Sequence, residues 1–264
     1  MKTILDTIIE QKRKEVHLLR KKFTYRDFEN SPYFERETHS LRQRIEAQEF
    51  GIIAEIKRKS PSAGEINMNI NISDLGQKYA QANVAGISCL TDTTFFGGST
   101  SDLTELREAV SIPILRKEFI IDEFQLFESK AIGADAILLI AEVLNEEEAL
   151  HLTIMAQQLG LEVLMECHDR KNLAKINDQV DLIGVNNRNL HLQKTDLSTS
   201  INLFDFLPNH IPCISESGIR DRSELLHLYK IGYKGALIGE RILKKEMPSA
   251  FIQSLNPSKI LNVC

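Results

Sequence analysis

The chain has 264 residues, of which 42% are hydrophobic and 26% are charged, and its formal net charge is −5 at pH 7. This length suits two average domains or one α/β barrel, and the acidic balance argues against nucleic acid or an anionic membrane as a partner. No run of about 18 apolar residues could span a membrane, and charges interrupt the N-terminus where a signal peptide would be apolar. We therefore expect a cytoplasmic protein with one domain, residues 1–264.

The N-terminal 50 residues have a helical pattern rather than that of a strand. Residues 3–22 place Ile4, Leu5 and Ile8 on one face of a helix and basic side chains on the other. A second, shorter helix is predicted over residues 38–48. We treat residues 1–50 as an N-terminal helical extension of the domain.

From residue 52 onward, short apolar runs alternate with longer amphipathic segments, as expected of repeated βα units. The runs predicted as strands are 52–57, 86–91, 112–116, 135–140, 161–166, 180–185, 211–215 and 235–238. Helix-starting residues such as Asp102 and Asn145 follow the strands, and Gly133 and Gly160 end two of the helices. Eight such units in about 200 residues predict a closed (β/α)8 barrel.

Polar side chains recur at the predicted carboxyl ends of these strands, where barrel enzymes carry their active sites. The set comprises Glu55, Lys57, Lys117, Glu166, Asn186, Arg188, Glu216, Ser217 and Gly218. Strand alternation places Lys117 on the same face as Leu115, and Glu166 on the same face as Leu164. Buried charges of mixed sign are costly unless they are paired or used, so their convergence favours a functional site.

A phosphate-binding region is predicted at the ends of the last two strands. "SESGI" (residues 215–219) and "ALIGERI" (residues 236–242) each place a glycine, Gly218 and Gly239, where backbone N–H groups can approach an anion. Lys57 and Ser60 of the first strand's loop could reach the same anion. "TFFGGS" (residues 94–99) lacks a lysine and is interpreted as an aromatic wall and a flexible loop.

Other chemistries have weaker support in the sequence. Seven histidines are scattered without the spacing of metal ligands, so no metal site is expected. His168 is interpreted as a solvated loop residue. The four cysteines form no CxxC pair, and Cys89, Cys167 and Cys213 lie in apolar runs typical of buried thiols in a reducing compartment.

Taken together, the strand-end motifs resemble one enzyme family. "AEIKRKSPSAG", "LTDTTFFGGS", "ILRKEFIIDEFQLFES", "ADAILLIAEVL", "MECHD", "GVNNRNL", "SESGI" and "ALIGERIL" are similar, in order, to motifs of indole-3-glycerol phosphate synthase of tryptophan biosynthesis. The resemblance runs from about residue 3 to residue 254. It implies a (β/α)8 barrel that converts the phosphosugar 1-(2-carboxyphenylamino)-1-deoxyribulose 5-phosphate to indole-3-glycerol phosphate, CO₂ and water without a cofactor.

The resemblance also implies roles for individual residues. Lys117 matches a general acid toward the substrate's ketone, and Glu166 matches a residue that transfers protons during dehydration, with Glu55 and Lys57 assisting. Asn186 and Glu216 complete the implied catalytic set. The implied substrate- and phosphate-binding set is Ser60, Arg188, Ser217, Gly218, Gly239, Phe95 and Phe119, with Phe96 as a further aromatic candidate. Glu240 stands where some members have a small residue, and it is left out of the site.

This chemistry offers a reason for paired charges on the first strand. Ring closure needs an acid where negative charge develops on the ketone oxygen, and loss of the hydroxyl needs another acid and a base. We expect a lysine and a glutamate in a partly dry site to have pKa values moved toward neutrality. The N-terminal extension either covers the barrel mouth and excludes water or only plugs a surface.

Two alternatives remain open from the sequence. Phosphoribosylanthranilate isomerase, another phosphosugar barrel, uses a cysteine on the first strand and an aspartate on the sixth, where this chain has Glu55 and Asn186. A non-catalytic barrel that only binds a phospho-ligand would explain the glycines and Lys57 but not buried Lys117 and Glu166. A monomer is expected, with weak association or a non-covalent partner as alternatives.

Overall fold

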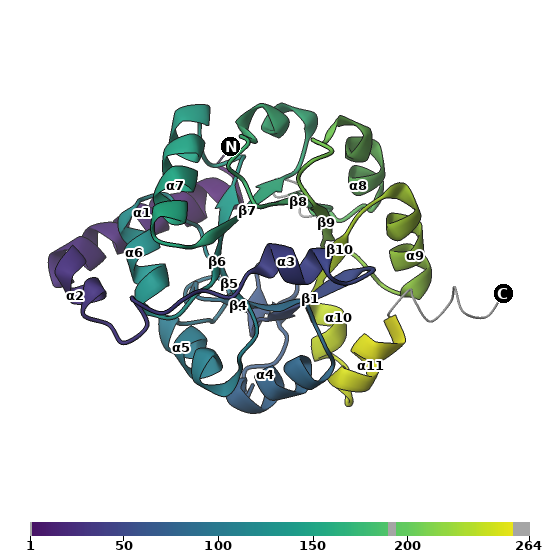
Figure 1. Cartoon of the computed structure of the whole chain (residues 1–264), viewed down its shortest axis with the longest axis horizontal. Helices are drawn as coiled ribbons and strands as arrows, with labels where there is room; N and C mark the ends of the chain where they lie inside the picture. The colour runs from purple at the N-terminus through teal and green to yellow at the C-terminus, as the bar shows by residue number, and fades with distance from the viewer. Residues whose placement is uncertain (1, 190–193, 256–264) are drawn as a thin grey trace.

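Eight parallel strands close into a barrel, as Figure 1 shows. The computed structural model describes residues 2–189 and 194–255. The strands pair in the closed order β1-β10-β9-β8-β7-β6-β5-β4, so each strand lies beside the next barrel strand of the chain. Their bounds are β1 (Gly51–Ile56), β4 (Gly86–Leu90), β5 (Ile114–Lys117), β6 (Ala136–Ile140), β7 (Glu162–Cys167), β8 (Leu182–Asn186), β9 (Cys213–Glu216) and β10 (Gly235–Ile238). The predicted (β/α)8 barrel is confirmed.

Helices surround the barrel and bury its outer face. They are α4 (Ile72–Gln81), α5 (Thr100–Ala109), α6 (Phe124–Ala131), α7 (Glu146–Gln158), η1 (Arg170–Lys175), α8 (Ser198–Leu203), η2 (Phe204–Phe206), α9 (Arg222–Ile231), α10 (Glu240–Leu243) and α11 (Pro248–Leu255). The segment after β7 is a 3₁₀ helix rather than an α-helix. Among these described helices, none is long and apolar enough to cross a membrane.

Some predicted boundaries were wrong by one to three residues, and the helix predicted over residues 38–48 spans Leu41–Glu46. Strands β5, β8 and β9 begin two residues later than predicted, because the apolar runs include loop residues that are buried ahead of the strand, such as Val180 and Ile211. A short antiparallel hairpin, β2 (Lys59–Ser60) and β3 (Gly64–Glu65), follows β1 and was not predicted. Cys89, Cys167 and Cys213 are free and buried as expected, whereas Cys264 lies outside the described residues.

Strand alternation divides the core into an inner and an outer layer. Side chains that point into the barrel form their own apolar cluster, which includes Ile53, Leu115, Leu138, Leu164, Leu182, Ile214 and Leu237. Two residues further along their strands, the same inward face carries Glu55, Lys117, Glu166 and Glu216. The predicted inward parity is therefore confirmed, and it directs these charged side chains toward the carboxyl end of the barrel.

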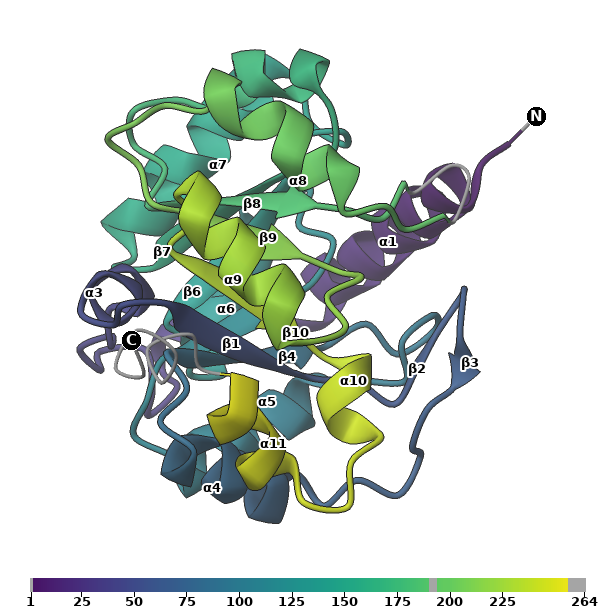
Figure 2. The same cartoon turned by 90° about the vertical axis from the view of Figure 1, so that its right-hand side faces the viewer.

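The N-terminal extension contacts both ends of the barrel (Figure 2). Helix α1 (Ile4–Lys22) crosses the carboxyl end, α2 (Tyr25–Glu29) packs against α6, and α3 (Leu41–Glu46) closes the amino end. Leu41 and Ile45 of α3 are fully buried within the inner apolar cluster. Glycines leave room for them, since a Cβ at Gly51 would lie 2.6 Å from Ile45 Cδ1. The extension therefore plugs one end and covers the other.

Candidate active site

A cavity of about 350 Å³ opens at the carboxyl end of the barrel. Its lining includes twelve of the thirteen residues predicted for the site: Glu55, Lys57, Ser60, Lys117, Phe119, Glu166, Asn186, Arg188, Glu216, Ser217, Gly218 and Gly239. Ile4, Leu5 and Ile8 of helix α1 also line it. The strand ends and the N-terminal extension thus build one compartment.

The floor of this cavity is an ionic cluster centred on Lys117. The ammonium Nζ lies 2.8 Å from Glu166 Oε2 and 2.5 Å from Glu216 Oε2, and both carboxylates are almost completely buried. Gly184 of β8 makes room for this arrangement, because a Cβ there would lie only 2.0 Å from Glu216 Oε1. That oxygen has no hydrogen-bond partner among the described residues. The cluster is therefore close-packed yet not saturated with hydrogen bonds.

The three ionisable side chains of the cluster shift one another's pKa. Burial lowers the pKa of Lys117, but the neighbouring carboxylates outweigh burial and the net shift is upward. Burial raises the pKa of Glu166, but Lys117 and His168 reverse this effect and bring the pKa down to about 2. The pKa of Glu216 rises to about 8, because burial and repulsion from Glu166 exceed the attraction of Lys117.

Pairing, rather than burial, determines the direction of the pKa shifts of Lys117 and Glu166. Lys117 and Glu166 do not move toward neutrality, because each is the other's counter-ion at hydrogen-bond distance. Glu216 is the residue of the cluster whose pKa lies near neutrality, so the cluster contains an ammonium, a carboxylate and a carboxyl group that still carries its proton at pH 7.

A second ion pair lies on β1 and in the loop after it. Lys57 Nζ is 2.5 Å from Glu55 Oε1, so Glu55 holds Lys57 in place. Gly239 is required beside it, since a Cβ there would lie 2.4 Å from the same oxygen. Ser60 is buried, and its Oγ accepts a hydrogen bond from the Ala63 N–H at 3.1 Å.

The polar rim of the cavity continues around the ends of β8, β9 and β10. Asn186 Oδ1 accepts the backbone N–H of Arg188 at 3.0 Å, and the Arg188 guanidinium donates to Ser62 Oγ. Ser217 and Gly218 both have positive φ angles, 66° and 75°. Glu240, which the sequence left outside the site, lies in the cavity wall. Its carboxylate pairs with Lys244 at 2.5 Å, and this hydrogen bond lowers its pKa.

The interpretation of His168 as a solvated loop residue was wrong. Its side chain is only 8% exposed, and Nε2 lies 3.4 Å from Glu166 Oε1 while Nδ1 lies 3.5 Å from Glu142 Oε2. The alternation of β7 could have predicted this position, because Leu164, Glu166 and His168 share one face. Glu166 therefore lies between Lys117 and His168.

The opposite wall of the cavity is apolar. Phe96 and Phe119 line it, with ring centroids 6.0 Å apart. Phe95, which was predicted for the site, is not part of the lining; the turn after Asp92 directs the next residue, Phe96, toward the cavity instead. The sequence could not separate two adjacent phenylalanines in a turn, because the choice depends on how Asp92 binds their backbone.

Comparison with known proteins identifies the family of this chain. The family model for indole-3-glycerol phosphate synthase matches residues 5–255. The indole-3-glycerol phosphate synthase of Bacteroides thetaiotaomicron is 41% identical over 254 residues, covering 96% of this chain and 98% of the relative. That of Salinibacter ruber is 38% identical and covers 96% and 95% of the two chains. This chain belongs to the indole-3-glycerol phosphate synthase family.

Solved structures support the fold of this indole-3-glycerol phosphate synthase family member. Tryptophan synthase subunit alpha from Legionella pneumophila aligns with a TM-score of 0.59 at 13% identity, covering 84% of this chain and 98% of that one. For 3-hexulose-6-phosphate synthase from Salmonella typhimurium the TM-score is 0.64 at 12% identity, with 80% and 99% covered. At these identities the likeness establishes the barrel alone. The family match, in contrast, includes helix α1, which contributes to the cavity.

Proposed function

We propose that this chain catalyses the indole-3-glycerol phosphate synthase reaction of tryptophan biosynthesis, as a carboxy-lyase. The observation that carries the proposal is the buried cluster of Lys117 with Glu166 and Glu216 on the floor of a cavity with one apolar and one cationic side. A substrate with an aromatic ring at one end and a phosphate at the other matches those two sides. The site residues and their roles below are part of this proposal.

Ring closure forms a bond between the aromatic carbon that carries the carboxylate and the ketone carbon. Lys117 stabilises the negative charge that develops on the ketone oxygen and protonates it. A lysine with a raised pKa can do so because an alkoxide is far more basic than an amine. Loss of CO₂ then returns electrons to the ring and restores its aromaticity.

Dehydration requires a proton for the departing hydroxyl group and a base for the hydrogen that is removed. Glu166 is ionised and serves as the base, and His168 beside it favours this ionised state. Glu216 in the same cluster and Lys57 in the loop after β1 supply acidic protons, and Asn186 orients the substrate. The ketone oxygen receives two protons and leaves as water, one proton is recovered from the C–H bond, and solvent supplies the other. No oxidant or reductant is consumed, so the enzyme needs no redox partner.

The phosphate is bound by the rim opposite the aromatic wall. Lys57, Arg188 and Ser60 contribute side chains there, and the backbone N–H groups near Gly218 and Gly239 contribute donors that a side chain would obstruct. Phe119 and Phe96 pack on the aromatic ring of the substrate, at about 0.5–1.5 kcal/mol for each well-placed ring pair.

Several accompanying properties are proposed with the function. No cofactor takes part, because the protons and charges that the steps require are all supplied by side chains of the cavity. The enzyme acts as a monomer in the cytoplasm, where its buried free thiols remain reduced.

The test is a direct assay of the purified chain. 1-(2-Carboxyphenylamino)-1-deoxyribulose 5-phosphate is added, and formation of the indole product is followed by its fluorescence. Steady product formation that depends on enzyme concentration is the expected result. Tight binding without product would instead favour a phospho-ligand-binding barrel, and turnover of phosphoribosylanthranilate would favour the isomerase.

A further inference from the structure

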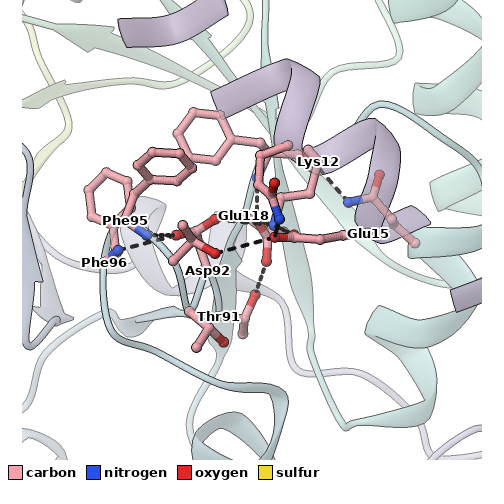
Figure 3. A network of polar contacts seen from close by, with 12 residues as sticks. Lys12, Glu15, Thr91, Asp92, Phe95, Phe96 and Glu118 are labelled. Atoms are coloured by element: carbon pink, nitrogen blue, oxygen red, sulfur yellow. Dashed lines mark hydrogen bonds and ion pairs between the residues drawn. The ribbon is translucent and has the colours of Figure 1, made fainter. Parts of the chain in front are cut away.

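Lys12 is a buried cation on the helix that covers the cavity (Figure 3). It lies in the middle of α1, is only 5% exposed, and is not among the cavity-lining residues. Its Nζ lies 2.5 Å from Glu15, 2.9 Å from Glu118 and 3.2 Å from Asp92. Burial lowers the pKa of Lys12, but these carboxylates outweigh burial and the net shift is upward. Removing these charges from water costs free energy that their mutual attraction has to offset, so the position of Lys12 calls for an explanation.

The two barrel carboxylates of this group hold the backbone of the aromatic wall. Asp92 Oδ1 accepts the N–H groups of Phe95 at 2.6 Å and Phe96 at 3.1 Å. Glu118 Oε1 accepts the N–H group of Phe119 at 2.8 Å. Lys12 therefore bridges the two carboxylates that fix the backbone at Phe96 and Phe119, as Figure 3 shows for the Asp92 turn.

The same lysine aligns the helix with the cavity. Ile8 lies one helical turn before Lys12, so the two side chains share one face of α1. Ile8 lines the cavity together with Ile4 and Leu5. The ion pairs of Lys12 therefore fix α1, which carries Ile8, relative to the strand-end loops, which carry Phe96 and Phe119.

Other groups around Lys12 define what its removal would leave. Thr91 Oγ1 donates to Glu118 Oε2 at 2.7 Å, and Arg116 lies 3.9 Å from the same oxygen. Glu118 therefore retains partners without Lys12. Asp92 would keep its two backbone donors but would lose the neighbouring positive charge of Lys12, so the loop that carries Phe96 is the more sensitive part.

We propose that Lys12 is a positioning residue that fixes the apolar side of the cavity and thereby determines how tightly the aromatic part of the ligand binds. The assignment of that side to an aromatic ring rests on the proposed function. Lys12 touches neither the reacting atoms nor the phosphate rim. Its effect is accordingly confined to ligands that carry an aromatic ring.

The test compares three variants of the full chain. Lys12→Met keeps the length and apolar stem of the side chain but removes its charge, and Lys12→Arg retains the charge. The matched control is Lys14→Met, because Lys14 lies on the same helix, is exposed, and has a 3.8 Å ion pair with Glu10. For each variant, kcat and KM are measured, together with the binding of 2-aminobenzoate and of inorganic phosphate.

We expect Lys12→Met to raise KM about tenfold and to weaken 2-aminobenzoate binding similarly, while kcat and phosphate binding change by less than about threefold. Lys12→Arg should recover most of the loss, and Lys14→Met should match the unaltered protein. An unchanged KM, or equal weakening of 2-aminobenzoate and phosphate, would overturn the proposal.

Two further measurements keep the result interpretable. If Lys12→Met does not fold, the double variant Lys12→Met, Asp92→Asn removes the uncompensated charge while keeping the oxygen that binds the Phe96 N–H, and the same selective loss is expected. If the unaltered protein makes no indole product, the proposed function fails, yet the two fragment-binding titrations still decide whether Lys12 controls the apolar side.

Discussion

The two ends of the barrel bury carboxylates in different ways. At the amino end, Asp135 is fully buried, and each of its oxygens accepts one guanidinium and one backbone donor: Arg36 and the His39 N–H, then Arg107 and the Ile114 N–H, all within 2.8 Å. At the carboxyl end, Glu216 is equally buried, yet one of its oxygens has no hydrogen bond among the described residues. A saturated carboxylate holds the fold together, whereas Glu216, which lines the cavity, keeps one buried oxygen without a hydrogen bond.

Glu162 supports the same contrast at the amino end. Its carboxylate accepts hydrogen bonds from the Ser40 hydroxyl and from the N–H groups of Leu41 and Arg42, at 2.8 and 2.9 Å for the latter two. It thereby accepts hydrogen bonds from backbone N–H groups in the first turn of α3, the helix that plugs this end. Charge at the amino end therefore serves packing, and charge at the carboxyl end lines the cavity where the proposed reaction takes place.

The largest expected effect is on stability and comes from the amino end. Asp135→Ala leaves Arg107 buried without its counter-ion, and we expect a loss of about 3–5 kcal/mol in the free energy of unfolding. Urea denaturation measures this loss, with Asp74→Ala as an exposed control that costs about 1 kcal/mol or less. The kcat of the folded fraction should hardly change. A large fall in kcat would contradict the division between the two ends.

The next effect is on catalysis and comes from the carboxyl end. Lys117→Ala should lower kcat by a factor on the order of 100 or more, equivalent to about 2.7 kcal/mol, because the developing oxyanion loses its acid. KM should change much less. Steady-state kinetics check this expectation against Lys78→Ala, an exposed lysine of α4. Unchanged kcat would remove Lys117 from the acid role.

A smaller effect concerns the pH dependence of stability. The pKa of Glu216 is raised to about 8 in the folded protein, so the folded state binds this proton more tightly than the unfolded chain does. Its contribution to stability is therefore fully present below about pH 4.5 and is lost as the pH rises toward 8. Glu216→Gln should become more stable than the unaltered protein across that window, by at least about 1 kcal/mol at pH 8. Urea denaturation of both proteins at pH 5 and pH 8 measures this difference. If the difference in free energy of unfolding between the two proteins is the same at both pH values, the assignment is refuted.

The last prediction is that removing metal ions leaves the reaction rate unchanged. Lys117 pairs with Glu166, Lys57 pairs with Glu55, and Glu216 keeps its proton at pH 7, so none of these three acidic groups has a negative charge left for a metal ion. We expect EDTA to leave the rate of indole formation unchanged. Inhibition by EDTA that a divalent metal reverses would show that the carboxyl end recruits a metal ion after all.

Local patterns in the sequence predicted much of this molecule, because strand alternation and turn residues are local properties. Alternation alone placed Lys117, Glu166 and Glu216 on the inner face of the barrel. It could not place Lys12, because the partners of that residue, Asp92 and Glu118, belong to strand ends far along the chain. Direct pairing also outweighs burial at Lys117 and Glu166, since burial alone would move both pKa values toward neutrality.

The N-terminal extension was predicted as helical, but its position depended on contacts that no local pattern contains. Periodicity identified the apolar faces of α1 and α3 without indicating which end of the barrel each would meet. Residues Ile4, Leu5 and Ile8 of α1 line the cavity, in line with the first of the two alternatives for the extension, whereas the position of α3 at the amino end was not predicted.

The plug formed by α3 also constrains when the protein can complete its fold. Ser40 and Leu41 bind Glu162, and Thr38 donates to the carbonyl of Gly160, so these contacts join residues more than 100 positions apart. During synthesis from the N-terminus, the plug must wait for more than half of the chain to emerge before its partners exist. Residues 38–41 are made well before residues 160–162, so the closing of the barrel's amino end is a non-local event in folding.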